Sequence, residues 1–125
     1  MSDATAPPPA PAPVGPYTPA VRAGGWLVCS GQLGLAGGKL VEGGVVAQVT
    51  QAVANIDALL RPHGASLTSV VKTTVFLADI ADYPVMNEAY TASFGDHRPA
   101  RSAFAVAALP LGAAVEIEAW AWIGT

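Results

Sequence analysis

The segment near the C-terminus, residues 115–123, constrains the fold more than any other part of the sequence. Its nine residues, VEIEAWAWI, alternate without interruption between two kinds of side chain. The first kind is aliphatic or small and the second is charged or aromatic: Val115, Ile117, Ala119 and Ala121 against Glu116, Glu118, Trp120 and Trp122. A period of two residues indicates a β-strand with two different faces. We therefore expect a sheet that packs one face on a core, while a neighbouring subunit at least partly covers its tryptophan-bearing face.

The rest of the chain predicts further strands and two helices around this strand. Apolar residues at three- and four-residue steps indicate helices, and runs of β-branched residues indicate strands. We expect two short strands within 21–30, a short edge strand within 31–44, a helix over 45–60, a strand over 70–77, a helix between the cap Asp82 and Gly95, and strands over 100–106 and 115–123. This order predicts an α+β fold with both helices on one face of the sheet.

Composition favours a single domain that associates with copies of itself. The chain has 125 residues, of which 52% are hydrophobic and only 12% are charged, against about 25% charged residues in an average soluble domain. Surplus apolar surface of this kind is commonly buried between subunits. The net charge is −3 and the six Lys and Arg residues are scattered, which argues against nucleic acid as a partner.

The N-terminal segment, residues 1–13, is expected to be a flexible tail rich in proline and alanine, ahead of one domain over residues 14–125. Five of its residues are prolines, which cannot donate ladder hydrogen bonds. It has no basic region followed by an apolar region, so we expect a cytoplasmic protein with no membrane span. The single cysteine, Cys29, excludes an internal disulfide and a multi-cysteine zinc site, and no metal site is expected.

Arg101 is the first candidate for chemistry because it lies in an otherwise small and apolar stretch, RPARSAFAVAALP. On a strand it shares a face with Ala103 and Ala105, whose short side chains leave space beside the guanidinium. A guanidinium in such a space suits a carboxylate or phosphate bound through two hydrogen bonds. An internal ion pair with Glu116 or Glu118 would explain the same pattern, and the spacing favours neither.

Glu116 and Glu118 are the second candidates. Two residues apart on one strand face, their carboxylates stand about 7 Å from each other. Such a carboxylate beside a cavity acts as a general base or positions a water. A solvated polar face, or ion pairs with cations such as Arg101, accounts for them equally well.

Four stretches together resemble the RidA/YjgF/UK114 family of small enamine and imine deaminases. They are GPYTPAV at 15–21, VCSGQ at 28–32, KTTVFLADIADYPVMNEAY at 72–90 and RPARSAFAVAALPLGAAVEIE at 98–118. The resemblance extends over about residues 14–123. It implies a chorismate-mutase-like α+β fold in which two helices back a six-stranded mixed sheet. It also implies a barrel-like homotrimer with three clefts between subunits.

The resemblance further implies a reaction. Members hydrolyse reactive 2-imino acids or their enamines, such as 2-aminoacrylate, to 2-keto acids and ammonia. No metal or organic cofactor is implied, and the partners are the small carboxylate substrate and the other subunits.

Individual roles follow from the same resemblance. Arg101 corresponds to the clamp for the substrate carboxylate, and Glu116 to the carboxylate that orients or activates water, a position that Glu118 fits less well. Tyr17 corresponds to a phenol that lines the cleft and assists protonation of the enamine. The substrate-binding positions are Arg101, Ser30 and Gly31 at the cleft wall, Asn87 at its edge, and Ala103, where members often have cysteine.

Two other functions stay open from the sequence. The chain could be a non-catalytic member that binds small carboxylates or other proteins, or, less favoured by its acidic balance, an endoribonuclease. Binding a carboxylate needs only Arg101, whereas hydrolysis also needs a group that handles water. The presence of Glu116 and Tyr17 therefore favours the deaminase.

Overall fold

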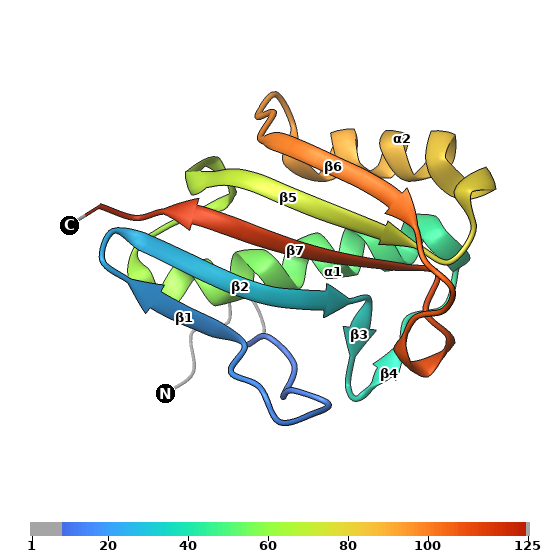
Figure 1. The fold of residues 1–125 in the computed structure, drawn as a ribbon, viewed down its shortest axis with the longest axis horizontal. Coiled ribbons are helices and arrows are strands. Elements are labelled where there is room, and N and C mark those ends of the chain that lie inside the picture. The colour runs from blue at the N-terminus through green and yellow to red at the C-terminus, as the bar shows by residue number, and fades with distance from the viewer. Residues whose placement is uncertain (1–8, 125) are drawn as a thin grey trace.

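The computed structural model describes residues 9–124, and Figure 1 shows their arrangement. The strands and helices are β1 (Ala20–Ala23), β2 (Trp26–Leu33), β3 (Leu35–Ala36), β4 (Lys39–Leu40), α1 (Gly44–Leu60), β5 (Val70–Leu77), α2 (Tyr83–Phe94), β6 (Ala100–Ala105) and β7 (Val115–Trp122). The predicted order of elements is confirmed. Most of the predicted tail, residues 1–13, lies outside the described residues, and its flexibility stays a prediction. No helix within residues 9–124 is long and apolar enough to cross a membrane.

The main sheet has five strands in the order β1-β2-β7-β5-β6. Its pairs are antiparallel except for β5 and β6, which are parallel. The predicted α+β class with two helices and a mixed sheet is therefore confirmed. The expected six-stranded sheet is wrong, because β3 and β4 pair only with each other in a separate two-stranded sheet.

Glycines explain why the chain leaves the main sheet after β2. A Cβ atom on Gly34 would lie 2.6 Å from the Cα atom of Gln48, so the backbone passes directly against α1 at this point. Gly37 and Gly38, with φ of 61° and 78°, then form the tight turn that joins β3 to β4. The glycine-rich stretch therefore forms a small hairpin of its own.

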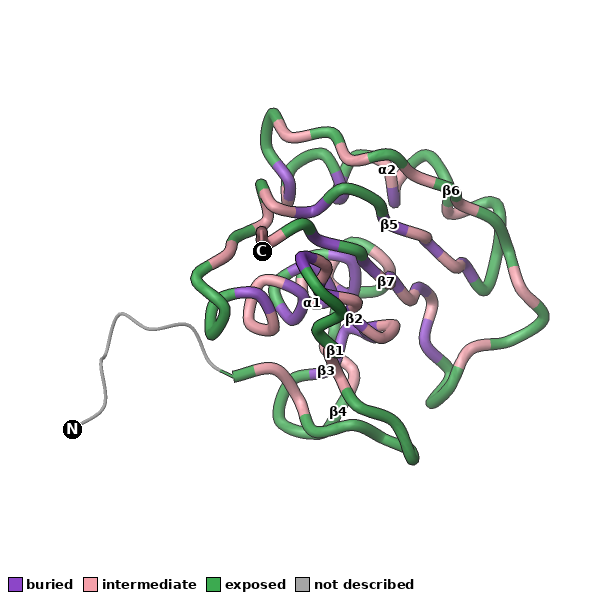
Figure 2. Tube along the Cα trace, turned by 60° about the vertical axis from the view of Figure 1, so that its left-hand side comes forward, coloured by how far each residue is buried: buried purple, intermediate pink, exposed green. Residues whose placement is uncertain are grey.

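Both helices cover one face of the main sheet and form a single core with it. The strand residues that face the helices are almost completely buried, and Figure 2 shows the resulting alternation along β5 and β7. Large side chains of this core that are completely buried include Leu27, Val49, Ile56, Leu60, Leu77, Met86 and Ile117. Burying each such side chain contributes about 1.5–3 kcal/mol. This core fixes the sheet that carries the predicted site residues.

The opposite face of the sheet is open and aromatic. Trp120 and Trp122 are 45% and 48% exposed, and Phe104 is 46% exposed. Trp26 meets the ring of Trp122 edge-on with centroids 5.1 Å apart. Coverage of this face by a neighbouring subunit stays a prediction.

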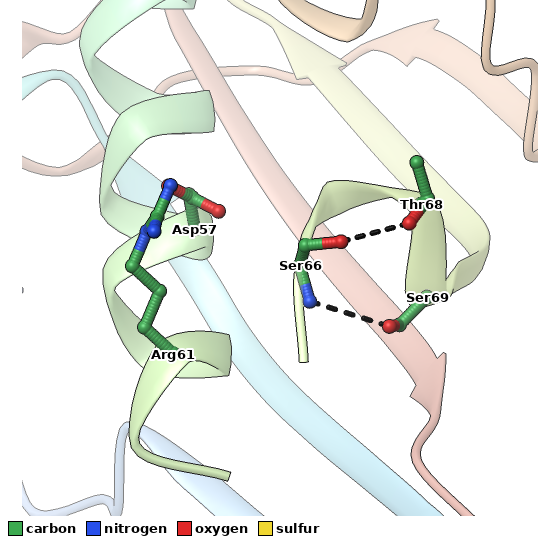
Figure 3. A network of polar contacts seen from close by, with 5 residues as sticks. All are labelled: Asp57, Arg61, Ser66, Thr68 and Ser69. Carbon is green, nitrogen blue, oxygen red and sulfur yellow. Dashed lines mark hydrogen bonds and ion pairs between the residues drawn. The ribbon is translucent and has the colours of Figure 1, made fainter. Parts of the chain in front are cut away.

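The connection from α1 to β5 is held by local polar contacts (Figure 3). Arg61 forms an ion pair of 2.7 Å with Asp57, one turn earlier along the chain. Ser66 begins a 3₁₀ turn at Leu67–Ser69, where its hydroxyl lies 2.7 Å from that of Thr68 and its backbone N–H donates to the Ser69 hydroxyl. The 3₁₀ turn ends at Ser69, and β5 begins at the next residue.

The start of α2 differs from the prediction in its capping. Asp82 precedes the helix as expected, but its side chain makes no capping hydrogen bond. Asp79 instead accepts a hydrogen bond of 2.9 Å from the Ala81 N–H and caps a short 3₁₀ turn, Ile80–Asp82. The helix continues from that turn, so Asp82 already has helical backbone geometry and cannot act as an ordinary cap.

Candidate functional site

The predicted site residues line two different cavities within one chain. Tyr17, Ser30, Gly31 and Glu116 border a cavity of about 230 Å³. Asn87 and Arg101 border another cavity, of about 260 Å³. Ala103 borders neither of them and packs against the core behind the sheet. A single chain therefore does not bring the proposed carboxylate clamp together with the proposed water-handling group.

The pairing of β2 with β7 builds the first cavity. Leu33 of β2 lies opposite Glu116 of β7, which brings the segment containing Gly31 under the glutamate side chain. A Cβ atom on Gly31 would lie 2.7 Å from Oε1 and 2.8 Å from Cδ of Glu116. Any other residue at position 31 would force the Glu116 carboxylate to move from its observed position.

The N-terminal segment closes this cavity from the side. The Ser30 hydroxyl donates a hydrogen bond of 2.7 Å to the carbonyl oxygen of Thr18, which ties this segment to β2. The Tyr17 hydroxyl accepts a hydrogen bond of 3.2 Å from the backbone N–H of Val14. The phenol and the carboxylate of Glu116 thus border the same space.

The environment of Glu116 favours its protonated form. Burial raises the pKa of this carboxyl above its ordinary value of 4.5, and the neighbouring charge of Glu118 raises it further. A carboxyl with a raised pKa exchanges a proton more readily near neutral pH, which suits a general acid or base.

Arg101 lies on the helix-facing side of the sheet. It belongs to β6 and stands beside buried Thr73 of β5. Its Nη2 donates to the Tyr83 hydroxyl at 3.1 Å, and its Nη1 lies 3.9 Å from Sδ of Met86. The guanidinium carbon is 4.9 Å from the centre of the Tyr90 ring, a distance typical of a cation–π contact.

These contacts exclude one of the two interpretations of Arg101 that the sequence left open, and the ligand clamp stays a prediction. Within residues 9–124, ion pairing is confined to Arg61 and Asp57. The internal ion pair of Arg101 with Glu116 or Glu118 is therefore not formed, because the glutamates extend from the open face of β7. Arg101 is surrounded by neutral aromatic and thioether groups that orient the cation without neutralising it.

Asn87 lines the Arg101 cavity and carries a buried acceptor. Its Oδ1 atom is buried and has no hydrogen-bond partner among the described residues. A buried amide oxygen without a partner is costly. The cavity itself is bordered by two cations, Arg98 and Arg101, which fits an anionic ligand.

Sequence reasoning missed the aromatic surroundings of Arg101. Tyr83, Met86 and Tyr90 are spaced by three and four residues, so they lie on one side of α2. The helical spacing places Met86 and Tyr90 on one side of the helix, but it gives no indication that Arg101 packs against them. Only the parallel pairing of β5 and β6 places the arginine there.

Cys29 borders neither cavity, and no metal-binding cluster is found beside them among the described residues. Burial raises the pKa of the Cys29 thiol to about 11, so it behaves as a small apolar side chain. In the described part of the chain, no three His, Cys, Asp or Glu residues are grouped so that they could hold a metal ion.

Comparisons with known proteins agree with the sequence motifs. The sequence model of the family described as Endoribonuclease L-PSP matches residues 8–123. A protein of Capra hircus named 2-iminobutanoate/2-iminopropanoate deaminase is 50% identical over 112 residues, which cover 88% of this chain and 82% of the relative.

Solved structures show the same fold. RidA from an Antarctic Psychrobacter has a TM-score of 0.86 and 44% identity, and the match covers 90% of this chain and 93% of that chain. TdcF of E. coli, solved with bound serine, has a TM-score of 0.85 and 34% identity, with 90% and 92% covered. The resemblance stated from the motifs is confirmed.

Proposed function

Because the chain belongs to the Endoribonuclease L-PSP family, which includes RidA and YjgF, we propose that it hydrolyses 2-imino acids and their enamines to 2-keto acids and ammonia. Relatives 46–50% identical are named 2-iminobutanoate/2-iminopropanoate deaminases. Small imines of this type, 2-aminoacrylate among their enamine forms, are the proposed substrates. No cofactor takes part in the proposed reaction.

The observation that carries this proposal is the state of Arg101. A partly buried guanidinium with neutral neighbours and an adjacent cavity is built to receive an anion. Asn87 borders the same cavity, and in our proposal its amide turns the unpartnered Oδ1 toward the N–H of the imine or enamine. The serine seen in TdcF carries the same two groups, a carboxylate and an amine.

The second half of the site is supplied by another copy of the chain in our proposal. The open sheet face carries Glu116 and the exposed tryptophans, and a low share of charged residues favours self-association. A homotrimer would bring the Glu116 cavity of one copy to the Arg101 cavity of the next. Each of the three clefts would then hold one complete set of groups.

To hydrolyse an enamine or imine, such a cleft must bind the carboxylate, protonate the enamine and activate a water molecule. Arg101 binds the substrate carboxylate and orients the C2 carbon. An enamine first takes a proton at C3, which Tyr17 is placed to assist, and becomes the protonated imine. Glu116 accepts a proton from water as the oxygen bonds to C2 and then gives that proton to nitrogen. The C–N bond breaks as the new hydroxyl loses its proton to Glu116 or solvent, which leaves the keto acid and ammonia.

The two alternative functions, carboxylate binding without catalysis and RNA cleavage, require different residues. A protein that only binds carboxylates would need Arg101 but not Glu116. An endoribonuclease would need a basic surface, whereas this chain has a net charge of −3 and six scattered cations. The residues at the two cavities therefore support the deaminase best.

A coupled assay tests the proposal. A dehydratase or amino-acid oxidase generates the imine, and the appearance of the keto acid is timed with and without the protein. We expect acceleration over solvent hydrolysis, and a loss of about 30-fold or more in Arg101→Ala, since removing one partner of a buried charge pair costs at least about 2 kcal/mol. No acceleration by the unaltered protein would refute the deaminase.

A mixing experiment tests the shared cleft. Arg101→Ala and Glu116→Gln chains are each expected to be inactive, but refolding them together in equal amounts should restore about a quarter of the clefts, because one chain supplies Arg101 and the other Glu116. A mixture as inactive as its components would show that both groups act within one chain. Sedimentation of the same mixture reports whether it is trimeric.

A further inference from the structure

We propose that Tyr83 is a positioning residue for Arg101, fixing the guanidinium in the orientation that binds the substrate carboxylate. This rests on the proposed function, in which Arg101 is the clamp. Neither the sequence pattern nor the resemblance pointed to Tyr83.

The contacts around Arg101 divide into two kinds. Tyr90 supports the guanidinium through its ring, and its hydroxyl lies 2.7 Å from that of buried Thr73. Tyr90 therefore belongs to the core. Tyr83 instead contacts Arg101 through both its hydroxyl and its ring. The hydroxyl accepts a hydrogen bond of 3.1 Å from Nη2, and the ring centre lies 5.6 Å from the guanidinium carbon.

Tyr83 is poorly explained as a packing residue. It is 38% exposed and lies outside the buried core cluster that includes Met86 and Tyr90 of the same helix. Its only recorded side-chain hydrogen bond within the described residues is the one to Arg101. The side chain thus contributes little to the core, and its polar atom is aimed at the cation.

The position of Tyr83 also leaves the ligand side of Arg101 open. Tyr83 is not among the residues that line the Arg101 cavity, whereas Asn87 and Tyr90 are. Its hydroxyl therefore takes one N–H from outside the cavity. A guanidinium is planar, so fixing Nη2 on one side also fixes the directions of the remaining donors.

The mechanism predicts a specific kinetic change. Without the Tyr83 hydroxyl, Arg101 samples more orientations, and the carboxylate must select the productive one. Because the clamp holds substrate and transition state alike, the loss falls on KM rather than kcat. A hydrogen bond to a charged, partly exposed group predicts an increase in KM of about three- to tenfold for Tyr83→Phe.

The test compares Tyr83→Phe, which removes only the hydroxyl, with Ile80→Ala, a neighbouring exposed position that touches neither cavity. Steady-state KM and kcat are measured in the coupled assay, and urea unfolding reports stability. Calorimetric binding of 2-oxobutanoate, a stable 2-keto acid, gives a readout that does not depend on turnover.

We expect Tyr83→Phe to raise KM and weaken 2-oxobutanoate binding by similar factors, with kcat and the unfolding midpoint close to those of the unaltered protein, while Ile80→Ala changes neither constant. Unchanged KM and binding in Tyr83→Phe would overturn the inference while leaving the deaminase intact. A fall in kcat and stability without weaker binding would also overturn it, since it would indicate a structural role. If the unaltered protein binds the keto acid but does not accelerate hydrolysis, the deaminase fails and the calorimetry alone decides the role of Tyr83.

Discussion

The two faces of the sheet differ sharply although they alternate along the same strands. On β7, Ile117 and Ala119 are fully buried against the helices, whereas Trp120 is 45% exposed. The helix-facing side is completed by this chain alone. The open side carries aromatic groups that pair with one another, such as Phe76 with Phe104, but no element of residues 9–124 covers them. The contrast teaches that the described residues finish one surface of the sheet, and that the other is the surface on which we propose a second copy packs.

The same contrast separates the two halves of the site. Glu116 extends from the open face, and Arg101 lies on the helix-facing side beside α2. Substitutions on the two faces should therefore have effects of different kinds. The core on the helix-facing side controls folding of the single chain, and the open aromatic face is the proposed interface. The proposed chemistry uses one group from each side, Arg101 and Glu116.

Shortening a side chain on the helix-facing side should have the largest effect. Ile117→Ala removes atoms from a fully buried position and should lower the free energy of unfolding by about 2–5 kcal/mol, because the core cannot fill the cavity completely. Urea unfolding measures this loss. Ile80→Ala, at a position 57% exposed, is the control and should change stability by no more than about 0.5 kcal/mol. Equal losses in the two variants would break the comparison.

A charged residue introduced on the open face should weaken self-association rather than the stability of the single chain. Trp120→Glu is expected to weaken self-association by at least about tenfold, since it would bury a carboxylate between copies. Activity should fall as well, because the proposed clefts form only between associated copies. Sedimentation measures association, and circular dichroism checks that the chain stays folded. Trp120→Phe, which keeps an aromatic group, should retain the assembly. A Trp120→Glu variant that assembles normally would show that this face is not the interface.

A methyl group beneath Glu116 should have a smaller and local effect. In Gly31→Ala the new carbon would fall within 2.7 Å of Oε1 of Glu116, so the flexible end of the glutamate must move. We expect kcat to fall by about three- to tenfold, corresponding to about 1 kcal/mol, with little change in unfolding. Glu116→Gln is the reference for complete loss of the base. Normal kcat in Gly31→Ala would mean that the observed place of the carboxylate is not required.

The smallest effect concerns pH. The charge of Glu118 raises the pKa of Glu116, although less than burial does. Glu118→Gln should therefore lower the pKa of Glu116. The acid side of the pH–activity profile should then move to lower pH, because Glu116 ionises there. A raised pKa in the folded chain also means that the contribution of Glu116 to stability is greatest below its ordinary pKa of 4.5 and is lost as pH rises through the raised pKa. In Glu118→Gln this decline should be weaker. An unshifted profile would show that Glu116 does not set the acid limb.

Much of the fold follows from local pattern. The alternation in residues 115–123 predicted which side of β7 is buried, and the helical steps in 45–60 predicted α1. The sixth strand was wrong because the contact of Gly34 with α1 depends on tertiary packing that the glycine-rich stretch does not reveal. Asp82 as a cap was wrong because the preceding turn, capped by Asp79, already supplies helical geometry.

The site was predictable as a set of residue types but not as an arrangement. The motifs identified Arg101 and Glu116, and spacing could not tell an ion pair from a ligand clamp. The structure shows them on different sides of the sheet, which depends on the order of strands. The tyrosines beside Arg101 were missed because their contact joins α2 to β6, and no periodicity within either element records it.

Strand β6, which carries Arg101, is an edge strand of the five-stranded sheet. Its outer backbone groups have no strand partner among the described residues, and Phe104 beside them is exposed. Such an edge is a template for pairing with other extended chains. In the proposed trimer, a newly made copy that has not yet met its partners would be open to aggregation at the strand that carries Arg101, so rapid assembly would protect solubility as well as activity.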